Sequence, residues 1–303
     1  MYTWRDMRKI PQIYMNQNIG KTWNLAFTLE KPFSNGLWAK VAYSYGESKN
    51  TVDAGSIASG SFLNNQHSRD PNNPGLGFSG ASAGHRIFGT FSYHKEYLKI
   101  GATTVSLFYE TRTAGNGCYA FSGDLNNDGG TSNDLIYIPN TSETNFSNIT
   151  SSTGTVLFTP AQQAAAFETF ISQDSYLSKN RGKYAQRGAA FLGLTTNVDF
   201  SLAQDIIART ASTKHSFQIR ADILNFGNLL NHNWGTGRGF TSLQPLITTS
   251  SSSTSTCRVP AATTAVSYCL RTLGGNLVSS PYIRTANAGD VYRIQIGFRY
   301  TFN

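Results

Sequence analysis

Strict alternation of apolar and polar residues is the feature that most restricts how this chain can fold. The clearest case is the segment 291–302, where most odd-numbered positions are polar or small. Its even-numbered positions form an apolar stripe with aromatic residues toward both ends: Tyr292, Ile294, Ile296, Phe298, Tyr300 and Phe302. Because successive side chains of a strand point to opposite faces, we predict a strand with one apolar and one polar face.

The same period of two recurs in six further segments. They are 23–30, 37–47, 86–97, 101–111, 196–206 and 215–225, and the first twenty residues hold a poorer pattern that is a candidate for an eighth strand. Apart from 23–30, the segments run to about 10–12 residues, whereas soluble strands are usually about 5–6 and a tilted strand needs about 9–11 to cross a bilayer. Their length favours a membrane barrel over a soluble sandwich whose core would hold these stripes.

The connections between these segments alternate in length. The short ones are 30–37, 98–100 and 206–215, and the long ones are 47–86, 111–196 and 226–291. Outer-membrane barrels sort their connections in this way, with tight periplasmic turns and extended extracellular loops. We therefore expect an all-β fold, specifically an antiparallel transmembrane β-barrel segment with long extracellular loops, whose last strand ends on the periplasmic side.

Composition supports this fold class and argues against several functions. Charged residues make up only 14% of the chain, well below the ~25% of ordinary soluble domains. The net charge of +8 comes from scattered Lys and Arg residues, so no nucleic-acid partner is predicted. No catalytic, dinucleotide or phosphate-loop motif stands out, so an enzyme is not expected. The first residues lack the apolar core of a signal peptide, which leaves a cytoplasmic protein or a longer chain whose start is missing.

A set of motifs in a fixed order resembles a known family. In chain order they are HRIFGTFSYHKEY, TTVSLFYETRTAG, DLNNDGGTSNDLIYIP, RGKYAQRG, DFSLAQD, DILNFGNLLNHNWG and the terminal YRIQIGFRYTFN. From about residue 22 onward the chain resembles the C-terminal barrel region of TonB-dependent outer-membrane receptors, and among them the Oar-like receptors common in Bacteroidetes. The resemblance implies a barrel of about 22 strands, of which residues 1–303 would supply about eight, and a plug domain and TonB box that they do not contain.

The resemblance also implies a location and partners. The chain would lie in the cell outer membrane, as part of a receptor that takes up or binds a bulky substrate such as an oligosaccharide, peptide or siderophore. Its partners would be outer-membrane lipid, the barrel-insertion machinery, the TonB complex reached through the plug, and an unknown extracellular ligand. The stripe from Tyr292 to Phe302 resembles the assembly signal that the insertion machinery reads. Two alternatives stay open, namely a small autonomous outer-membrane barrel or surface adhesin without TonB coupling, and a secreted β-rich binding module.

The longest connection contains a motif typical of the start of a calcium loop. Asp124, Asn126 and Asp128 occupy the first three ligand positions of such a loop. Its twelfth position, a bidentate Glu in EF-hands, is Leu135, and Asp134 lies one residue before it. One hypothesis is a calcium ion held by these three residues and Asp134, and no other cofactor is predicted. The alternative is an Asx-rich turn whose side chains bond to their own backbone.

Two further local features carry predictions. Thr159 followed by Pro160 is typical of a helix N-terminus, so we expect a helix over 160–172 inside the longest connection. Of the three cysteines, Cys257 and Cys269 flank a Ser/Thr-rich segment and would pair in an oxidising compartment, leaving Cys118 over. Three unpaired cysteines are the alternative.

Overall fold

One antiparallel sheet of long strands dominates the fold. The computed structural model describes residues 18–32, 34–55, 57–97, 100–209, 214–250, 256–258 and 266–302. The long strands pair in sequence order: β1 (Lys21–Pro32), β2 (Leu37–Asn50), β4 (Gly84–Tyr97), β5 (Gly101–Thr113), β13 (Leu194–Arg209), β14 (Lys214–Leu224) and β21 (Arg293–Phe302). The short β3 (Gly77–Phe78) pairs with the end of β2. The all-β, antiparallel class is therefore confirmed.

The strand boundaries differ in detail from those that the alternation predicts. Most strands continue for a few residues past the predicted ends, because polar residues there still pair in the ladder. The last strand is shorter than predicted and begins at Arg293, since the Tyr292 N–H bonds to Oδ1 of Asn228 (3.3 Å) instead of to a strand. The candidate strand in the first twenty residues falls mostly on 1–17, outside the described residues, and stays a prediction.

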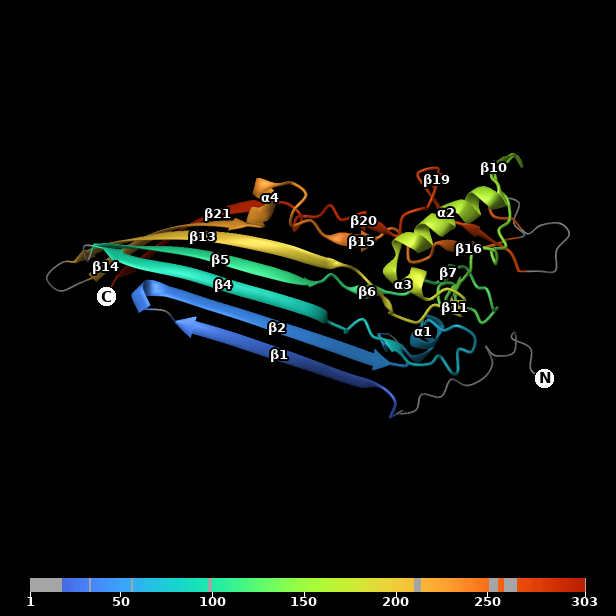
Figure 1. Cartoon of the computed structure of the whole chain (residues 1–303), viewed down its shortest axis with the longest axis horizontal. Helices are drawn as coiled ribbons and strands as arrows, with labels where there is room; N and C mark the ends of the chain where they lie inside the picture. The colour runs from blue at the N-terminus through green and yellow to red at the C-terminus, as the bar shows by residue number, and fades with distance from the viewer. Residues whose placement is uncertain are drawn as a thin grey trace.

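The connections are sorted between the two ends of the sheet. Figure 1 shows the long strands running along the long axis, with the β1–β2 and β4–β5 connections at one end and most of the helices and short strands gathered at the other. We call this second part the cap and define it as the described residues of 51–83, 114–193 and 238–284. The predicted alternation of short and long connections therefore agrees with the structure.

The register places the apolar stripes of all seven long strands on one face. One row across six neighbouring strands reads Ala39, Phe91, Leu107, Phe200, Ile223 and Ile294. Many side chains of this face are open to the surroundings, among them Leu29 (76% exposed) and Phe298 (69% exposed). We call this surface, to which Leu25 and Phe27 also belong, the apolar face. The opposite face carries mostly Ser, Thr, Asn, small residues and charges.

Little of the described chain covers the apolar face. Helix α4 (Phe226–Leu230) packs against β13, where the rings of Phe226 and Phe200 lie 5.5 Å apart. No second sheet of the described residues lies on this face, since the remaining short strands belong to the connections. The sheet is also open, because β1 and β21 stand at its two edges and do not pair with each other. None of the described helices is long and apolar enough to span a membrane.

The hydrophobic core lies in the cap. Its largest buried side chains are Tyr119, Ile136, Ile138, Phe167, Phe170, Ile171, Leu177, Leu246 and Leu270. Helix α2 (Pro160–Gln173) supplies three of them, and its start has the predicted cap: the Thr159 hydroxyl accepts from the Gln162 N–H (3.3 Å), and the Gln162 side chain accepts from the Thr159 N–H (2.9 Å). The helix expected over 160–172 is confirmed.

Short elements and one disulfide complete the cap. The helices are α1 (Ala58–Leu63) and α3 (Ser175–Lys179). The paired strands are β6 (Asn116–Gly117) with β12 (Ala190–Phe191), β8 (Tyr137–Ile138) with β11 (Lys183–Tyr184), β9 (Ile149–Thr150) with β10 (Val156–Phe158), β15 (Arg238–Phe240) with β20 (Tyr282–Arg284), β18 (Thr272–Leu273) with β19 (Asn276–Leu277), and β16 (Leu246–Thr248) with β7 (Phe121–Ser122) and β17 (Tyr268–Leu270). Cys257 and Cys269 form a disulfide, which is one of the two alternatives that the sequence left open, and Cys118 is free.

Removing a core side chain should loosen the cap specifically. Phe167 is 0% exposed, so Phe167→Ala should lower the free energy of unfolding of the cap by about 3–5 kcal/mol through lost burial and a cavity. The matched control is Leu157→Ala, because Leu157 is 51% exposed and should change stability by less than about 0.5 kcal/mol. Hydrogen exchange of the α2 amides measures both. Equal acceleration of exchange in the two variants would contradict this view of the core.

Candidate metal centre

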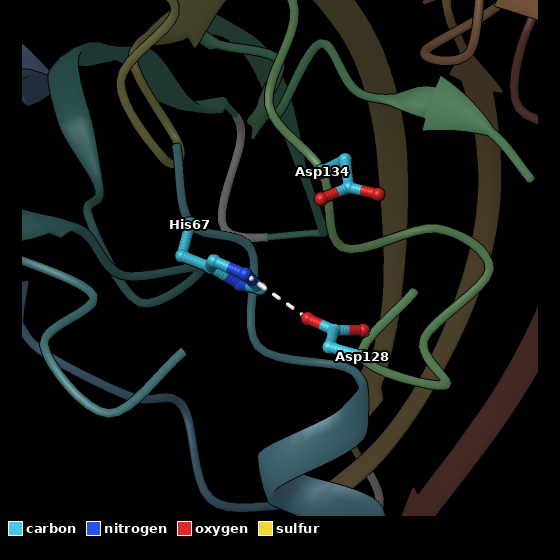
Figure 2. A group of neighbouring side chains, drawn as sticks. All are labelled: His67, Asp128 and Asp134. Atoms are coloured by element: carbon cyan, nitrogen blue, oxygen red, sulfur yellow. Dashed lines mark ion pairs between the residues drawn. The ribbon is translucent and has the colours of Figure 1, made fainter. Parts of the chain in front are cut away.

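Three buried side chains from two different connections converge inside the cap. His67 follows α1, whereas Asp128 and Asp134 belong to the segment between β7 and β8. One ligand atom of each lies within 4.8 Å of the others, and the three residues are 1%, 4% and 6% exposed. Figure 2 shows the His67 ring directed at the Asp128 carboxylate, with the Asp134 carboxylate beside them. This is the one such group that the described residues contain.

Backbone pairing brings the two connections together at this point. The His67 N–H donates to the Asn133 carbonyl (2.9 Å), and the Leu135 N–H donates to the His67 carbonyl (2.9 Å). These bonds form a parallel bridge between His67 and Asp134, so the two residues lie side by side. The convergence therefore follows from main-chain bonds that bracket the site.

The Asx residues before the bridge fold the chain into tight turns. Asp124 accepts the N–H of Asp128 at Oδ1 (3.1 Å) and the N–H of Gly129 at Oδ2 (2.9 Å). Asn126 Oδ1 also accepts the Asp128 N–H (3.0 Å), and Asp128 Oδ1 accepts the Gly130 N–H (2.7 Å). Such side-chain bonds to nearby backbone are the Asx-turn pattern that the sequence offered as the alternative to a calcium loop.

The four residues predicted to bind calcium are thus not equivalent in the structure. Asp128 and Asp134 point into the cluster, and Asn126 Nδ2 lies 3.1 Å from His67 Nε2. Asp124 has both carboxylate oxygens engaged by backbone N–H groups. Calcium held by these four residues stays a prediction. His67 was missed because it comes from another connection, and no spacing rule links a lone histidine to a motif so far along the chain.

Hydrogen bonds fix the orientation of the histidine. His67 Nδ1 lies 3.1 Å from the Asn65 carbonyl oxygen, which only accepts, so Nδ1 carries a proton. His67 Nε2 then faces Asp128 Oδ2 at 3.1 Å. Asn133 Nδ2 lies 3.1 Å from both oxygens of Asp128 and holds that carboxylate in place. The imidazole and the carboxylate are therefore each fixed by a further partner, as ligands in metal sites usually are.

Burial and neighbouring charges act on the pKa values in opposite directions. Burial is the largest single effect on His67 and favours its neutral form, but the hydrogen bonds to Asp128 and to the Asn65 carbonyl, together with the charges of Asp128 and Asp134, outweigh it and raise the pKa of His67 above its ordinary value. Burial likewise opposes the charge on Asp128, but bonds from His67, backbone N–H and Asn133 lower its pKa to about 2. For Asp134 burial prevails, with the nearby charge of Asp128 adding to it, so its pKa is raised.

Two details show how closely the cluster is packed. Gly130 lies against the Asn133 amide, and a Cβ at this position would meet Asn133 Nδ2 at 2.1 Å, so a larger residue would displace Asn133. Asn133 is 1% exposed, and its Oδ1 has no hydrogen-bond partner within the described part of the chain. A buried acceptor without a partner is costly, and it lies on the amide that holds Asp128. An imidazole nitrogen, carboxylates and this free acceptor together are the donor types of a divalent metal site.

Comparison with known proteins yields no relative. No family model, curated protein or solved structure matches the chain. The resemblance to TonB-dependent receptors therefore remains a prediction from the motifs.

Removing the central carboxylate should open both connections. Asp128→Ala leaves His67, Asn133 and the Gly130 N–H without their buried acceptor, so local stability should fall by about 3–5 kcal/mol. Asp70→Ala is the matched control, since Asp70 is exposed and accepts a single bond from the Asn72 N–H (2.9 Å). Hydrogen exchange at the amides of His67 and Leu135 reports the difference. Unchanged protection in Asp128→Ala would show that the cluster does not hold the connections.

Proposed function

We propose that the chain is part of an outer-membrane β-barrel and that its apolar face contacts lipid. The observation that carries the proposal is the apolar face itself, which runs across seven neighbouring strands and stands largely exposed. Soluble monomers rarely expose a contiguous apolar patch of more than a few hundred Å². A face of this kind needs an apolar partner, and the alternation of the strands suits hydrocarbon on one side and water on the other.

Strand length supports the same environment. The long strands range from 10 residues in β21 to 16 in β13. A strand tilted at about 45° needs about 9–11 residues to cross the hydrocarbon of a bilayer. In lipid, each unpaired backbone group at the edges of β1 and β21 would cost several kcal/mol. We therefore infer that further strands pair with both edges and close the barrel.

The opposite face is suited to a water-filled interior. Ion pairs lie on it, among them Lys40 with Glu30 (3.3 Å), Arg86 with Glu110 (2.7 Å) and Arg220 with Asp222 (2.8 Å). Exposed charges of this kind are stable in water and costly in hydrocarbon. Together with its small Ser, Thr and Asn side chains, this face favours the wide lumen of a large barrel over the filled interior of a small one.

The receptor role rests on the motifs that resemble Oar-like TonB-dependent receptors. In that role the barrel gives a polar passage, the cap contributes to recognition of a bulky extracellular ligand, and a plug coupled to the TonB complex drives uptake. The cap has the rigid packing that a recognition surface needs, because aromatic side chains and α2 fill its interior. Oligosaccharides, peptides and siderophores remain the ligand classes proposed.

Spin labels on adjacent residues of β21 test the contact with lipid. In a Cys118→Ser background, a label at Ile296→Cys should collide with oxygen, which concentrates in hydrocarbon, because Ile296 is 64% exposed on the apolar face. The matched label at Gln295→Cys lies on the opposite face and should collide with a water-soluble nickel complex instead. The readout is power-saturation electron paramagnetic resonance in outer-membrane vesicles. Preferential collision of the Ile296→Cys label with nickel would reject lipid contact.

The terminal stripe should be needed for insertion. Phe302→Ser removes the last aromatic side chain of the stripe, which is 69% exposed, and should lower the amount of chain in the outer membrane several-fold. Thr301→Ser is the control, because Thr301 lies on the opposite face of β21. Quantitative immunoblots of outer-membrane fractions measure both variants. Normal outer-membrane levels of the Phe302→Ser variant would contradict the assembly role of the stripe.

A further inference from the structure

We propose that His67, Asp128 and Asp134 bind one divalent first-row transition metal ion, with zinc as the probe, which links two connections of the cap. The proposal differs from a calcium loop in both its ligands and its metal. It rests on cap residues alone and does not depend on whether the sheet contacts lipid.

The distances suit a shared ion. Zinc–nitrogen and zinc–oxygen bonds are about 2.0–2.2 Å, which places neighbouring ligand atoms of one ion roughly 3–4 Å apart. His67 Nε2 and Asp128 Oδ2 are 3.1 Å apart, and all three ligand atoms lie within 4.8 Å of one another. Asn126 Nδ2 lies 3.1 Å from both His67 Nε2 and Asp128 Oδ2, so a shared ion would take the place of this amide between the two ligand atoms.

The residues around the cluster prepare it for a metal. The bond from Nδ1–H of His67 to the Asn65 carbonyl (3.1 Å) leaves Nε2 as the ligand atom, and this arrangement is the usual one for metal-bound histidine. Asn133 Nδ2 orients Asp128, and the Leu125 N–H donates to Asp134 Oδ2 (2.8 Å). Each of the three ligands thus has a partner behind it that fixes its direction.

Two observations favour a cation at this cluster. Asn133 Oδ1 is a buried acceptor without a partner, on the same amide that bonds Asp128. In addition, two buried carboxylates, those of Asp128 and Asp134, lie beside one histidine in this cluster. A dication bound by His67, Asp128 and Asp134 would compensate the negative charge of the two carboxylates, and Asn133 Oδ1 could accept a hydrogen bond from a metal-bound water.

The ligand types decide the class of metal. Calcium prefers oxygen ligands only, whereas an imidazole nitrogen with carboxylates suits zinc and its neighbours. Asp124, which an oxygen-only calcium site would use, spends both carboxylate oxygens on backbone N–H groups. The site is therefore expected to select zinc over calcium, with Asp124 serving the turn and not the ion.

Metal titration of the purified, metal-stripped full chain in detergent tests the proposal. The wild type should bind one equivalent of zinc, and calcium in large excess should not displace it. His67→Gln should weaken zinc binding by at least about tenfold, since removing a ligand costs no less than disturbing its outer partners. His232→Gln is the matched control, because His232 is exposed outside the cluster, and it should leave binding unchanged. Asp124→Asn should also retain zinc.

X-ray absorption of the zinc-loaded wild type keeps the test independent of variant folding. A first shell that contains imidazole and oxygen supports the site. A first shell with sulfur, or with oxygen alone, overturns it. Calcium binding that Asp124→Asn abolishes and His67→Gln spares would also overturn it, in favour of the oxygen-only set. If the His67 and Leu135 amides are protected, so that the chain is folded, and no zinc binds, the proposal is wrong. The cluster is then only a histidine–aspartate pair.

Discussion

Backbone pairing in the long sheet is the constraint on which the rest of the structure depends. Each inner strand has its N–H and C=O groups bonded on both sides, whereas β1 and β21 each keep one edge open. The same register that satisfies the backbone also gathers the apolar stripes onto one face, because a shift of one residue in any strand would place its apolar side chains on the polar face. The backbone pairing of the strands therefore also determines which side chains form the apolar face.

Sheet and cap are held by different forces. Among the described residues, no core cluster of buried hydrophobic side chains lies in the sheet, which depends on its ladder and on whatever contacts the apolar face, while the cap has a dense aromatic core. Arg187 joins the two parts, since its buried guanidinium donates to the Asn50 carbonyl and Oδ1 at the end of β2 and lies 3.3 Å from Asp53. The cap is therefore fixed to the strands that carry it.

The sequence predicted what depends on local pattern and missed what depends on contact between distant segments. The period of two located every long strand, and Thr159 with Pro160 located α2, because each signal lies within a few residues. The pairing of Cys257 with Cys269 could only be offered as one alternative, since spacing does not determine geometry. His67 could not be found at all, because its place beside Asp134 follows from a backbone bridge between two connections.

Residues 124–134 can form an Asx turn and also contribute ligands to a metal site, because different residues of the motif serve the two roles. Asp124 and Asn126 bond to backbone N–H groups, and these bonds fold the chain so that Asp128 turns inward. Gly130 then leaves room for the Asn133 amide that holds the Asp128 carboxylate. Asp124 and Asn126 build the turn, and Asp128 points into the cluster. The calcium-like spacing therefore reflects the turn. The kind of ion that suits the site is decided by the histidine from the other connection.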